Sequence, residues 1–410
     1  MNIRPILSTL LRHKMAAALI VLEIALSCAI ICNALFLISN RIDRIKQGSG
    51  AVENEIVHVQ ITGIGTDDNA EALTRSDLAI LQGLPGVKAA TSTNQVPYGN
   101  GSWNTSIKMV KDQKQPTMSA TVYMTDDSFM DTMGLKLVSG RRFNTDEFIE
   151  WSVLNAPGSK AQIPAVIITH SMADKLFPAG DALGKTFYSW GDNPLRVVGV
   201  VEHLARPNEQ GGPAQREYSM MFPIRAPYTL GATYLIRSEE SRRDEVMKSA
   251  VDALRKNGPN RIVIEENTKT MEAMRADYYR QDRAMAWLLS TVIIALLVVT
   301  ALGIVGLASF WVQQRTKQIG IRRALGATRG QILRYFQTEN FLLATIGIAL
   351  GMLLAYAINQ LLMAKYELPR LPLAYLPVGA IALWLLGQFA VFWPARRGAA
   401  VPPAVATRSA

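Results

Sequence analysis

Four long stretches of this 410-residue chain carry almost no charge. They cover residues 15–38, 285–312, 340–363 and 372–393, and Glu23 is the only residue in them with a formal charge. A helix needs about 20 apolar residues to cross the roughly 30 Å hydrocarbon core of a bilayer. Each stretch is long enough, so the sequence predicts a membrane protein with four transmembrane α-helices. It argues against a soluble enzyme and against a secreted disulfide scaffold.

The basic residues lie beside these stretches. Residues 39–284 carry 29 Lys and Arg against 30 Asp and Glu, so the net charge of +10 comes from the rest of the chain. The basic excess lies in three short segments, 1–14, 313–339 and 394–410. Short basic segments stay in the cytoplasm. The pattern predicts cytoplasmic termini, an exterior location for residues 39–284 and for the short 364–371 loop, and no nucleic-acid partner.

The two ends of the chain have distinct patterns. Residues 1–14 place apolar side chains at helical spacing and basic ones opposite, which predicts an amphipathic elbow helix on the inner membrane surface. The first apolar stretch is longer than the core of a signal peptide, so we expect it to remain as an uncleaved anchor. Residues 398–410 are rich in Ala and Pro, and we expect an irregular tail there.

Residues 39–284, here called the large domain, have the pattern of an α+β fold. Alternating or β-branched runs predict strands, and amphipathic runs predict helices between them. The predicted strands are 55–62, 165–169, 195–201 and 261–265, and the predicted helices are 76–82 and 242–256. A Gly- and Asn-rich stretch near residue 95 marks the start of a candidate inserted subdomain, from about 95 to 215.

Two helical patterns flank the large domain. Apolar residues step by three and four past the first span and again before the second, which is the spacing of a coiled-coil seam. These seam residues are Leu35, Ile38, Ile42 and Ile45 on one side and Met271, Met274 and Tyr278 on the other. We predict two helical stalks that pack together and carry the large domain. The alternative is two separate amphipathic helices on that domain's own core.

The segment from Gln313 to Glu339, here called the hairpin, contains signals for two helices and a tight turn. Gly326 is placed to end the first helix, and Thr328 with Gln331 forms a capping box that starts the second. A short, basic, helical hairpin at the inner surface is suited to docking a partner. The alternative is an ordinary basic loop held by lipid phosphates.

The hairpin also carries a family resemblance. It reads QIGIRRALGAT over residues 318–328 and continues as ILRYFQTENFLLATIGIALG over residues 332–351. These segments resemble the cytoplasmic signature of the FtsX/MacB-type ABC transporter permeases. Within the large domain, LQGLPGV (81–87), FMDTMGL (129–135), SGRRF (139–143), and ALGKT (182–186) followed by VVGVV (197–201) are similar to that family's periplasmic core domain.

The resemblance implies that the hairpin contacts an ATPase subunit. One position departs from the family pattern, because Gln318 stands where the usual motif has Glu before Ile-Gly-Ile-Arg-Arg. The resemblance makes nine residues candidates for ATPase coupling: Arg315, Lys317, Gln318, Ile319, Gly320, Arg322, Arg323, Leu325 and Gly326.

No segment of the chain predicts catalysis. The run from Gly180 to Thr186 resembles a P-loop, but it has three residues between its glycines where the motif needs four. We expect Lys185 and Thr186 to lie in a turn that leads into a strand. The four histidines and two cysteines show no metal-binding spacing, and no GxSxG elbow is present. The sequence therefore predicts a non-catalytic subunit with no metal site and no cofactor of its own.

Three features of the spans are candidate sites or contacts. Glu23 is an intramembrane charge, which suggests either a role in translocation or a carboxylate near the inner leaflet that is protonated or bonded to a neighbouring helix. Gly347, Gly351 and Ala355 form a ridge of small residues for close helix packing, within the chain or between subunits. Cys28 and Cys32 lie one helical turn apart, and we expect them to be small apolar fillers.

The resemblance implies a mechanotransmission permease of the bacterial inner membrane. It would work as a dimer, with a second copy or a related permease, and with a cytoplasmic ABC ATPase dimer that binds ATP and Mg²⁺. The implied task is export of a peptide, an antibiotic or a lipid-linked substrate, with a periplasmic adaptor and an outer-membrane channel as further candidate partners. The alternative is a transmembrane regulator that activates a cell-wall hydrolase.

Overall fold

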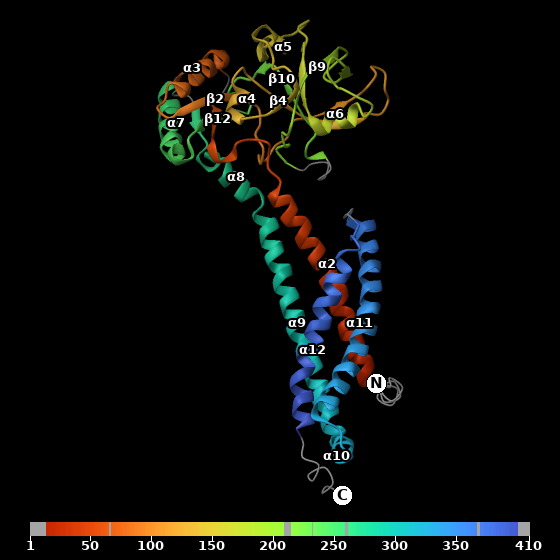
Figure 1. Cartoon of the computed structure of the whole chain (residues 1–410). Helices are drawn as coiled ribbons and strands as arrows, with labels where there is room; N and C mark the ends of the chain where they lie inside the picture. The colour runs from red at the N-terminus through yellow and green to blue at the C-terminus, as the bar shows by residue number, and fades with distance from the viewer. Residues whose placement is uncertain are drawn as a thin grey trace. The chain divides into compact units, whose positions relative to one another are not determined.

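The computed structural model describes residues 14–64, 67–208, 215–231, 233–258, 261–366 and 370–400. They fall into two compact units (Figure 1). One is the large domain, which covers residues 47–280 in the structure where the sequence predicts 39–284. The other is a helical unit formed by the chain before and after it. The predicted elbow lies outside the described residues except for Lys14, and so do residues 401–410 of the predicted tail.

The helical unit contains five described helices: α2 (Lys14–Lys46), α9 (Arg280–Gln314), α10 (Thr316–Ala324), α11 (Arg329–Tyr366) and α12 (Tyr375–Ala399). All but α10 are long and apolar enough to cross a membrane. They overlap the four predicted stretches, which confirms that part of the fold. The helix α12 runs six residues beyond the predicted span, because Ala395 and Ala399 are buried in the helical core.

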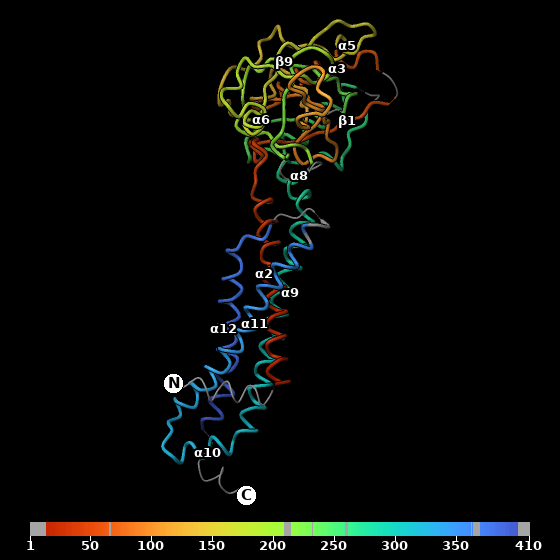
Figure 2. The backbone as a smooth tube through the Cα atoms, turned by 90° about the vertical axis from the view of Figure 1, so that its right-hand side faces the viewer, coloured from red at the N-terminus to blue at the C-terminus, as the bar shows by residue number. Residues whose placement is uncertain are grey.

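Small residues set the packing of these helices. In Figure 2, α2, α9, α11 and α12 run side by side. An ideal Cβ built on Gly351 of α11 would lie only 2.5 Å from the Cys28 Cβ of α2 and 2.6 Å from the Ala25 carbonyl oxygen. Gly379 of α12 approaches the Cys32 Sγ in the same way. Without the drive of water exclusion, membrane helices associate through such close van der Waals contact.

The large domain is built on two sheets. The first has the order β13-β1-β12-β2, and β14 also pairs with β1. Its strands are β1 (Ile56–Gly63), β2 (Val87–Thr93), β12 (Thr233–Ser238), β13 (Arg261–Val263) and β14 (Lys269–Thr270). Val57, Val59 and Ile61 alternate along β1 and form a core with α3 (Ala70–Gln82) and α7 (Arg243–Asn257). The residues between them, including His58 and Gln60, face the other side of the sheet.

The second sheet has the order β3-β4-β10-β7-β9-β5, with β8 paired to β9. Its strands are β3 (Asn104–Ile107), β4 (Met118–Met124), β5 (Leu137–Gly140), β7 (Val166–Thr169), β8 (Thr186–Tyr188), β9 (Pro194–Val201) and β10 (Ser219–Phe222). A separate pair joins β6 (Ile149–Glu150) to β11 (Ile224–Arg225). The short helices are α4 (Phe129–Met133), α5 (Trp151–Leu154), α6 (His170–Leu176) and α8 (Met271–Tyr278). Single 3₁₀ turns cover 53–55, 145–147, 240–242 and 265–267.

The predicted elements of the large domain match the structure closely in place. Each of the four predicted strands overlaps an observed one, and helix 242–256 differs from α7 by one residue at each end. The helix predicted at 76–82 begins earlier, at Ala70, because Ala70 itself packs in the core. The second sheet is inserted between β2 and β12, and β10 extends it beyond residue 215.

Candidate functional site

The hairpin has the turn that its sequence predicts. Gly326 has a backbone φ of +95°, the left-handed region that favours glycine. The Gly326 N–H donates to the Arg323 carbonyl at 3.1 Å, and the Ala327 N–H donates to the Arg322 carbonyl at 3.0 Å. This pair of bonds is a Schellman motif, which satisfies carbonyl groups at the end of α10.

The next helix starts with the predicted capping box. The Thr328 N–H donates to the Gln331 side-chain oxygen at 2.9 Å, and the Gln331 N–H donates to the Thr328 hydroxyl at 3.2 Å. The two bonds satisfy backbone donors that the first turn of α11 would otherwise leave open. Both ends of the turn are therefore held by local hydrogen bonds.

A buried ion pair joins the base of the hairpin. Arg315 lies at the break between α9 and α10, and its Nη1 is 3.0 Å and 2.9 Å from the two carboxylate oxygens of Glu339 on α11. The Arg315 side chain is 8% exposed and the Glu339 side chain 2%. The Arg315 guanidinium also lies 5.6 Å from the ring centre of Trp311. The sequence analysis missed this partnership; its signal was the single acid among the six basic residues of the hairpin.

The structure divides the nine coupling candidates into two groups. Arg315, Ile319 and Gly320 are buried within the chain's own fold. The other six lie wholly or partly at the surface: Lys317, Gln318, Arg322, Arg323, Leu325 and Gly326. The surface group therefore contains the residues that a partner could touch directly, and the buried group holds the hairpin's shape.

The surface of the hairpin mixes apolar and basic side chains. Leu325 is 83% exposed and Ile321 is 46% exposed. A cavity of about 470 Å³ lies between α10 and α11, where the Arg322 guanidinium stacks 5.0 Å from the ring centre of Tyr335. Exposed apolar residues beside positive charge suit either a protein partner or an anionic membrane surface.

The ridge of small residues packs within the chain. An ideal Cβ on Gly347 would lie 2.9 Å from the Ile24 Cβ, and Ala355 is fully buried. The carbonyl of Ala355 accepts a hydrogen bond of 3.1 Å from the Asn33 side chain. Gly347, Gly351 and Ala355 therefore contact α2 within the chain, and a contact of this ridge between subunits stays a prediction.

Glu23 lies against α9. The carboxylate of Glu23 occupies space that a Cβ at Gly303 would fill, so the missing side chain of Gly303 leaves room for it. One turn further along, the Ser27 and Thr300 hydroxyls are 2.8 Å apart and are buried. The structure places Glu23 beside another helix, and its role in the membrane stays a prediction.

The seam residues are divided between the two units. Leu35, Ile38, Ile42 and Ile45 lie on α2, which continues to Lys46. Met271 is fully buried in the large domain, and Met274 and Tyr278 line one of its cavities. These last three residues fit the alternative of an amphipathic helix on the domain's own core. Packing of the two predicted stalks stays a prediction. Within the helical unit, Arg41 and Arg44 both pair with Asp282 at the start of α9.

The segment that resembles a P-loop forms a turn into a strand. The Lys185 N–H donates to the Ala182 carbonyl at 3.2 Å, Gly184 has a φ of +74°, and β8 begins at Thr186. The Lys185 ammonium lies 5.1 Å from the ring centre of Phe177. Among the residues that the structure describes, no group of three or more His, Cys, Asp or Glu side chains could hold a metal ion.

Two family models match the chain. The MacB-like periplasmic core domain matches residues 17–268, and the FtsX-like permease C-terminal model matches residues 290–403. The chain belongs to the MacB/FtsX-type ABC transporter permeases. It is therefore a multi-pass membrane protein whose large domain is extracytoplasmic, and an ABC transporter permease works with an ATPase partner. Both matched segments are permease segments.

Individual relatives agree with this assignment. An uncharacterized ABC transporter permease of Bacillus subtilis, YknZ, is 25% identical, with 99% of this chain and 98% of the relative covered. The macrolide export ATP-binding/permease proteins MacB of Chromobacterium violaceum and Neisseria meningitidis are 25% and 26% identical. These matches cover 95% and 96% of this permease, which spans only 58% of the length of either MacB relative.

Two solved structures also match. The extracellular domain of YknZ is 18% identical over 51% of this permease and all of that chain, with a TM-score of 0.31. The periplasmic region of MacB from Actinobacillus actinomycetemcomitans is 16% identical over 57% of this permease and 97% of that chain, with a TM-score of 0.33.

Proposed function

We propose that this permease converts ATP hydrolysis by a separate cytoplasmic ATPase into movement of its extracytoplasmic domain. ATP and Mg²⁺ would bind in the partner, and this chain would have no catalytic residue of its own. The P-loop-like segment supports this division of labour, because its Lys185 sits in a turn outside the membrane. The ATPase would supply the energy, and this chain would transmit the resulting movement.

The observation that carries the proposal is the construction of the hairpin. Its base is held by the buried pair of Arg315 with Glu339, and its turn is fixed by Gly326. Its tip presents Leu325 and Arg322 at the surface. A force on the tip would therefore pass into α9 and α11 rather than bend the turn. These contacts support the proposal that the hairpin is a coupling element.

We place the hairpin and both termini in the cytoplasm of a bacterium, with the four helices in its inner membrane. The basic excess in the short segments supports this orientation. Protease added to spheroplasts should digest residues 39–284 and spare a tag attached after Ala410. Digestion of that tag from outside would contradict the orientation.

The proposed task is export of a peptide, an antibiotic or a lipid-linked substrate from the periplasmic side. The names of the MacB relatives, which are macrolide exporters, support export as the task. We further propose that the permease works as a dimer, with a second copy or a related permease. A periplasmic adaptor and an outer-membrane channel complete the proposed assembly.

The proposal is tested by purification of the tagged permease with and without its neighbouring gene products. The permease alone should neither bind nor hydrolyse ATP, and a cytoplasmic ATPase should co-purify with it and hydrolyse ATP. Lys185→Ala should leave the activity of the complex unchanged. ATP hydrolysis by the permease alone, abolished by Lys185→Ala, would overturn the proposed division of labour.

A further inference from the structure

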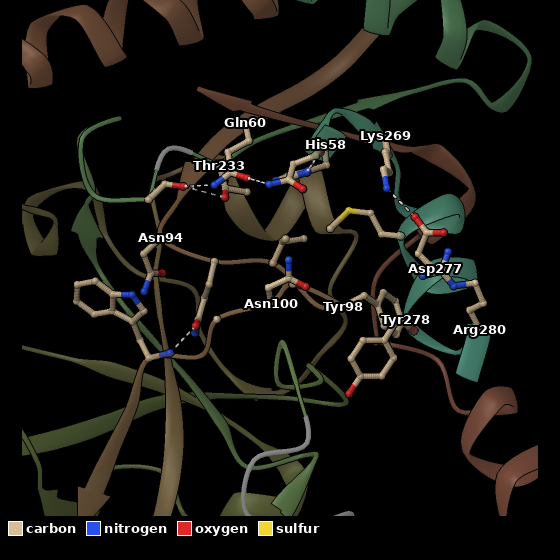
Figure 3. A pocket seen from close by; sticks show the side chains of 18 residues that line it. His58, Gln60, Asn94, Tyr98, Asn100, Thr233, Lys269, Asp277, Tyr278 and Arg280 are labelled. Atoms are coloured by element: carbon tan, nitrogen blue, oxygen red, sulfur yellow. Dashed lines mark hydrogen bonds and ion pairs between the residues drawn. The ribbon is translucent and has the colours of Figure 1, made fainter. Parts of the chain in front are cut away.

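The large domain contains a polar cavity of about 550 Å³ that the functions above do not use (Figure 3). Most of its lining comes from three places in the fold, and Asn267 and Lys269 also contribute. His58, Gln60 and Thr233 come from the face of the first sheet that α3 and α7 do not cover, and a loop from Asn94 to Trp103 follows β2. The third part is α8, through Met274, Asp277 and Tyr278.

His58 lines this cavity, and one of its ring nitrogens has no hydrogen-bond partner among the described residues. Only 3% of the His58 surface is exposed, and its Nδ1 is 2.5 Å from the Asn267 carbonyl oxygen. A carbonyl oxygen accepts only, so Nδ1 must donate and Nε2 must carry a lone pair. Nε2 has no hydrogen-bond partner among the described residues. Burial lowers the pKa of His58 to about 4, so the ring is neutral at physiological pH. An unpaired buried acceptor costs free energy that a donor from a ligand would recover.

The loop opposite is held in a strained conformation. Tyr98 has a φ of +67°, which is uncommon for a residue with a side chain. Its hydroxyl donates to Glu53 at 2.7 Å, and Gly99 and Gly101 follow it. Backbone strain of this kind clusters at binding sites, where the surrounding structure holds it. The loop ends at Trp103, which is 38% exposed and also lines the cavity.

The chemistry of the lining selects among ligands. Three charged side chains line the cavity. The Lys269 ammonium and the Asp277 carboxylate form an ion pair at 2.6 Å, so these two charges offset each other. The third, Arg280, is exposed, so solvent and salt screen its charge. A neutral imidazole does not attract an anion. The floor strand β1 is paired on both sides, with β12 on one side and β13 and β14 on the other, so a peptide finds no free strand edge there. Recognition must come from side chains.

We propose that this cavity binds a neutral, hydroxyl-bearing small molecule of the size of a mono- or disaccharide. A hydroxyl of the ligand would donate a hydrogen bond to His58 Nε2. The Trp103 ring would cover an apolar face of the ligand. The cavity volume lies within the range of about 300–1,000 Å³ found for small-molecule sites. The proposal goes beyond export. One wall of the cavity is α8, and α9 starts two residues after α8 ends. A ligand here would therefore contact the helix that leads directly into the second membrane span.

The test uses the full chain in lipid nanodiscs that were prepared without sugar-based detergents, since their headgroups would compete. The probes are maltose, N,N′-diacetylchitobiose and myo-inositol, and the counter-probes are the tripeptide Gly-Ala-Ala and inorganic phosphate. Binding is measured by calorimetry and by the ¹⁵N shift of the His58 ring nitrogens, assigned by comparison with His58→Gln. At least one hydroxylated probe should saturate and move the Nε2 signal.

Two variants on opposite walls keep the test independent of folding. His58→Phe removes the acceptor and should weaken binding about fivefold or more, the worth of one hydrogen bond. Trp103→Ala, at a partly exposed position, should also weaken binding. It should lower the unfolding temperature only slightly, because it removes a single edge contact with the Trp151 ring. The matched control is His170→Ala, because His170 is an exposed histidine on α6.

Three outcomes would overturn the proposal. The first is saturable binding of the tripeptide or of phosphate with none of the hydroxylated probes. The second is no saturable binding of any hydroxylated probe, and the third is an affinity in both wall variants equal to that of the wild type. Loss of ATPase coupling would leave these results unchanged, so the two proposals fail separately.

Discussion

Arg315 and Glu339 form a two-point ion pair inside the protein, with Nη1 within 3.0 Å of both carboxylate oxygens across 24 positions of sequence. The pair fixes the start of α10 to the side of α11. Both residues lie at the base of the hairpin, where its first helix departs from α9. Arg315, one of the nine coupling candidates, thus makes its ion pair within the chain's own fold.

Breaking this pair on one side should be costly. Arg315→Met or Glu339→Leu alone leaves a buried charge without its partner, and each should lower the free energy of unfolding by about 3–5 kcal/mol. The double variant should recover most of that loss, because two apolar side chains need no partner. The measurement is a double-mutant cycle of unfolding in detergent, followed by tryptophan fluorescence. The control is Glu265→Ala, which breaks an exposed pair with Arg255 and should cost at most about 1 kcal/mol. Additive losses in the double variant would show that the two charges do not act as a pair.

The contact between α2 and α11 should not tolerate a larger side chain at Gly351. A Cβ there would overlap Cys28 and the Ala25 backbone, so Gly351→Ala should destabilise the helical unit by about 1–3 kcal/mol. Gly306 on α9 is the matched control, because an added Cβ there meets no atom within 4 Å. Thermal unfolding in detergent compares Gly351→Ala with Gly306→Ala. Equal unfolding temperatures for the two variants would be evidence against this packing.

The large domain should lose stability as the pH falls below 6.5. The pKa of His58 is about 4 in the folded protein, against an ordinary value of 6.5, because burial disfavours its charged form. Between these values the unfolded chain binds a proton that the folded protein does not, so the free energy of unfolding falls by up to about 1.4 kcal/mol per pH unit. The measurement is the free energy of unfolding as a function of pH. His58→Gln should reduce its slope between pH 6.5 and 5, and His170→Gln, at an exposed position, should not. A curve for His58→Gln as steep as that of the wild type would contradict the buried neutral ring.

Local patterns in the sequence were sufficient for much of the architecture. The four spans follow from runs of apolar residues, and the turn at Gly326 follows from chain chemistry within a few residues. The alternation of Val57, His58, Val59 and Gln60 predicts a strand with two different faces. Each of these signals depends on neighbours in the sequence, so no knowledge of the fold is needed to see it.

Contacts between distant residues could not be predicted in the same way. Glu339 stands out as the single acid of the hairpin, but the sequence does not say which of the six basic residues it pairs with. The position of Glu23 beside Gly303 depends on how two helices are rotated. Met271, Met274 and Tyr278 have the spacing of a seam, yet that spacing is the same for a helix that packs on its own domain. The cavity at His58 needs the sheet, the loop after β2 and α8 together, and these come from widely separated parts of the chain.

The central claim is that the hairpin transmits force from the ATPase. Gly326→Val forces a β-branched residue to a φ of +95°, at a cost of about 1–2 kcal/mol or more, and should misdirect the end of α10. Arg322→Glu with Arg323→Glu reverses the charge that the hairpin presents. The control is Gly330→Ala, since Gly330 lies on α11 with a negative φ and no atom near its added Cβ.

The most direct measurement is ATP hydrolysis by the purified permease–ATPase complex in nanodiscs, normalised to the amount of permease in the membrane. The account predicts that Gly326→Val and the double charge reversal each lower stimulation of hydrolysis about fivefold or more, the range of a typical coupling free energy. Membrane abundance should stay near that of the wild type, and Gly330→Ala should behave as the wild type does. Full stimulation and full ATPase association in both hairpin variants would contradict the account.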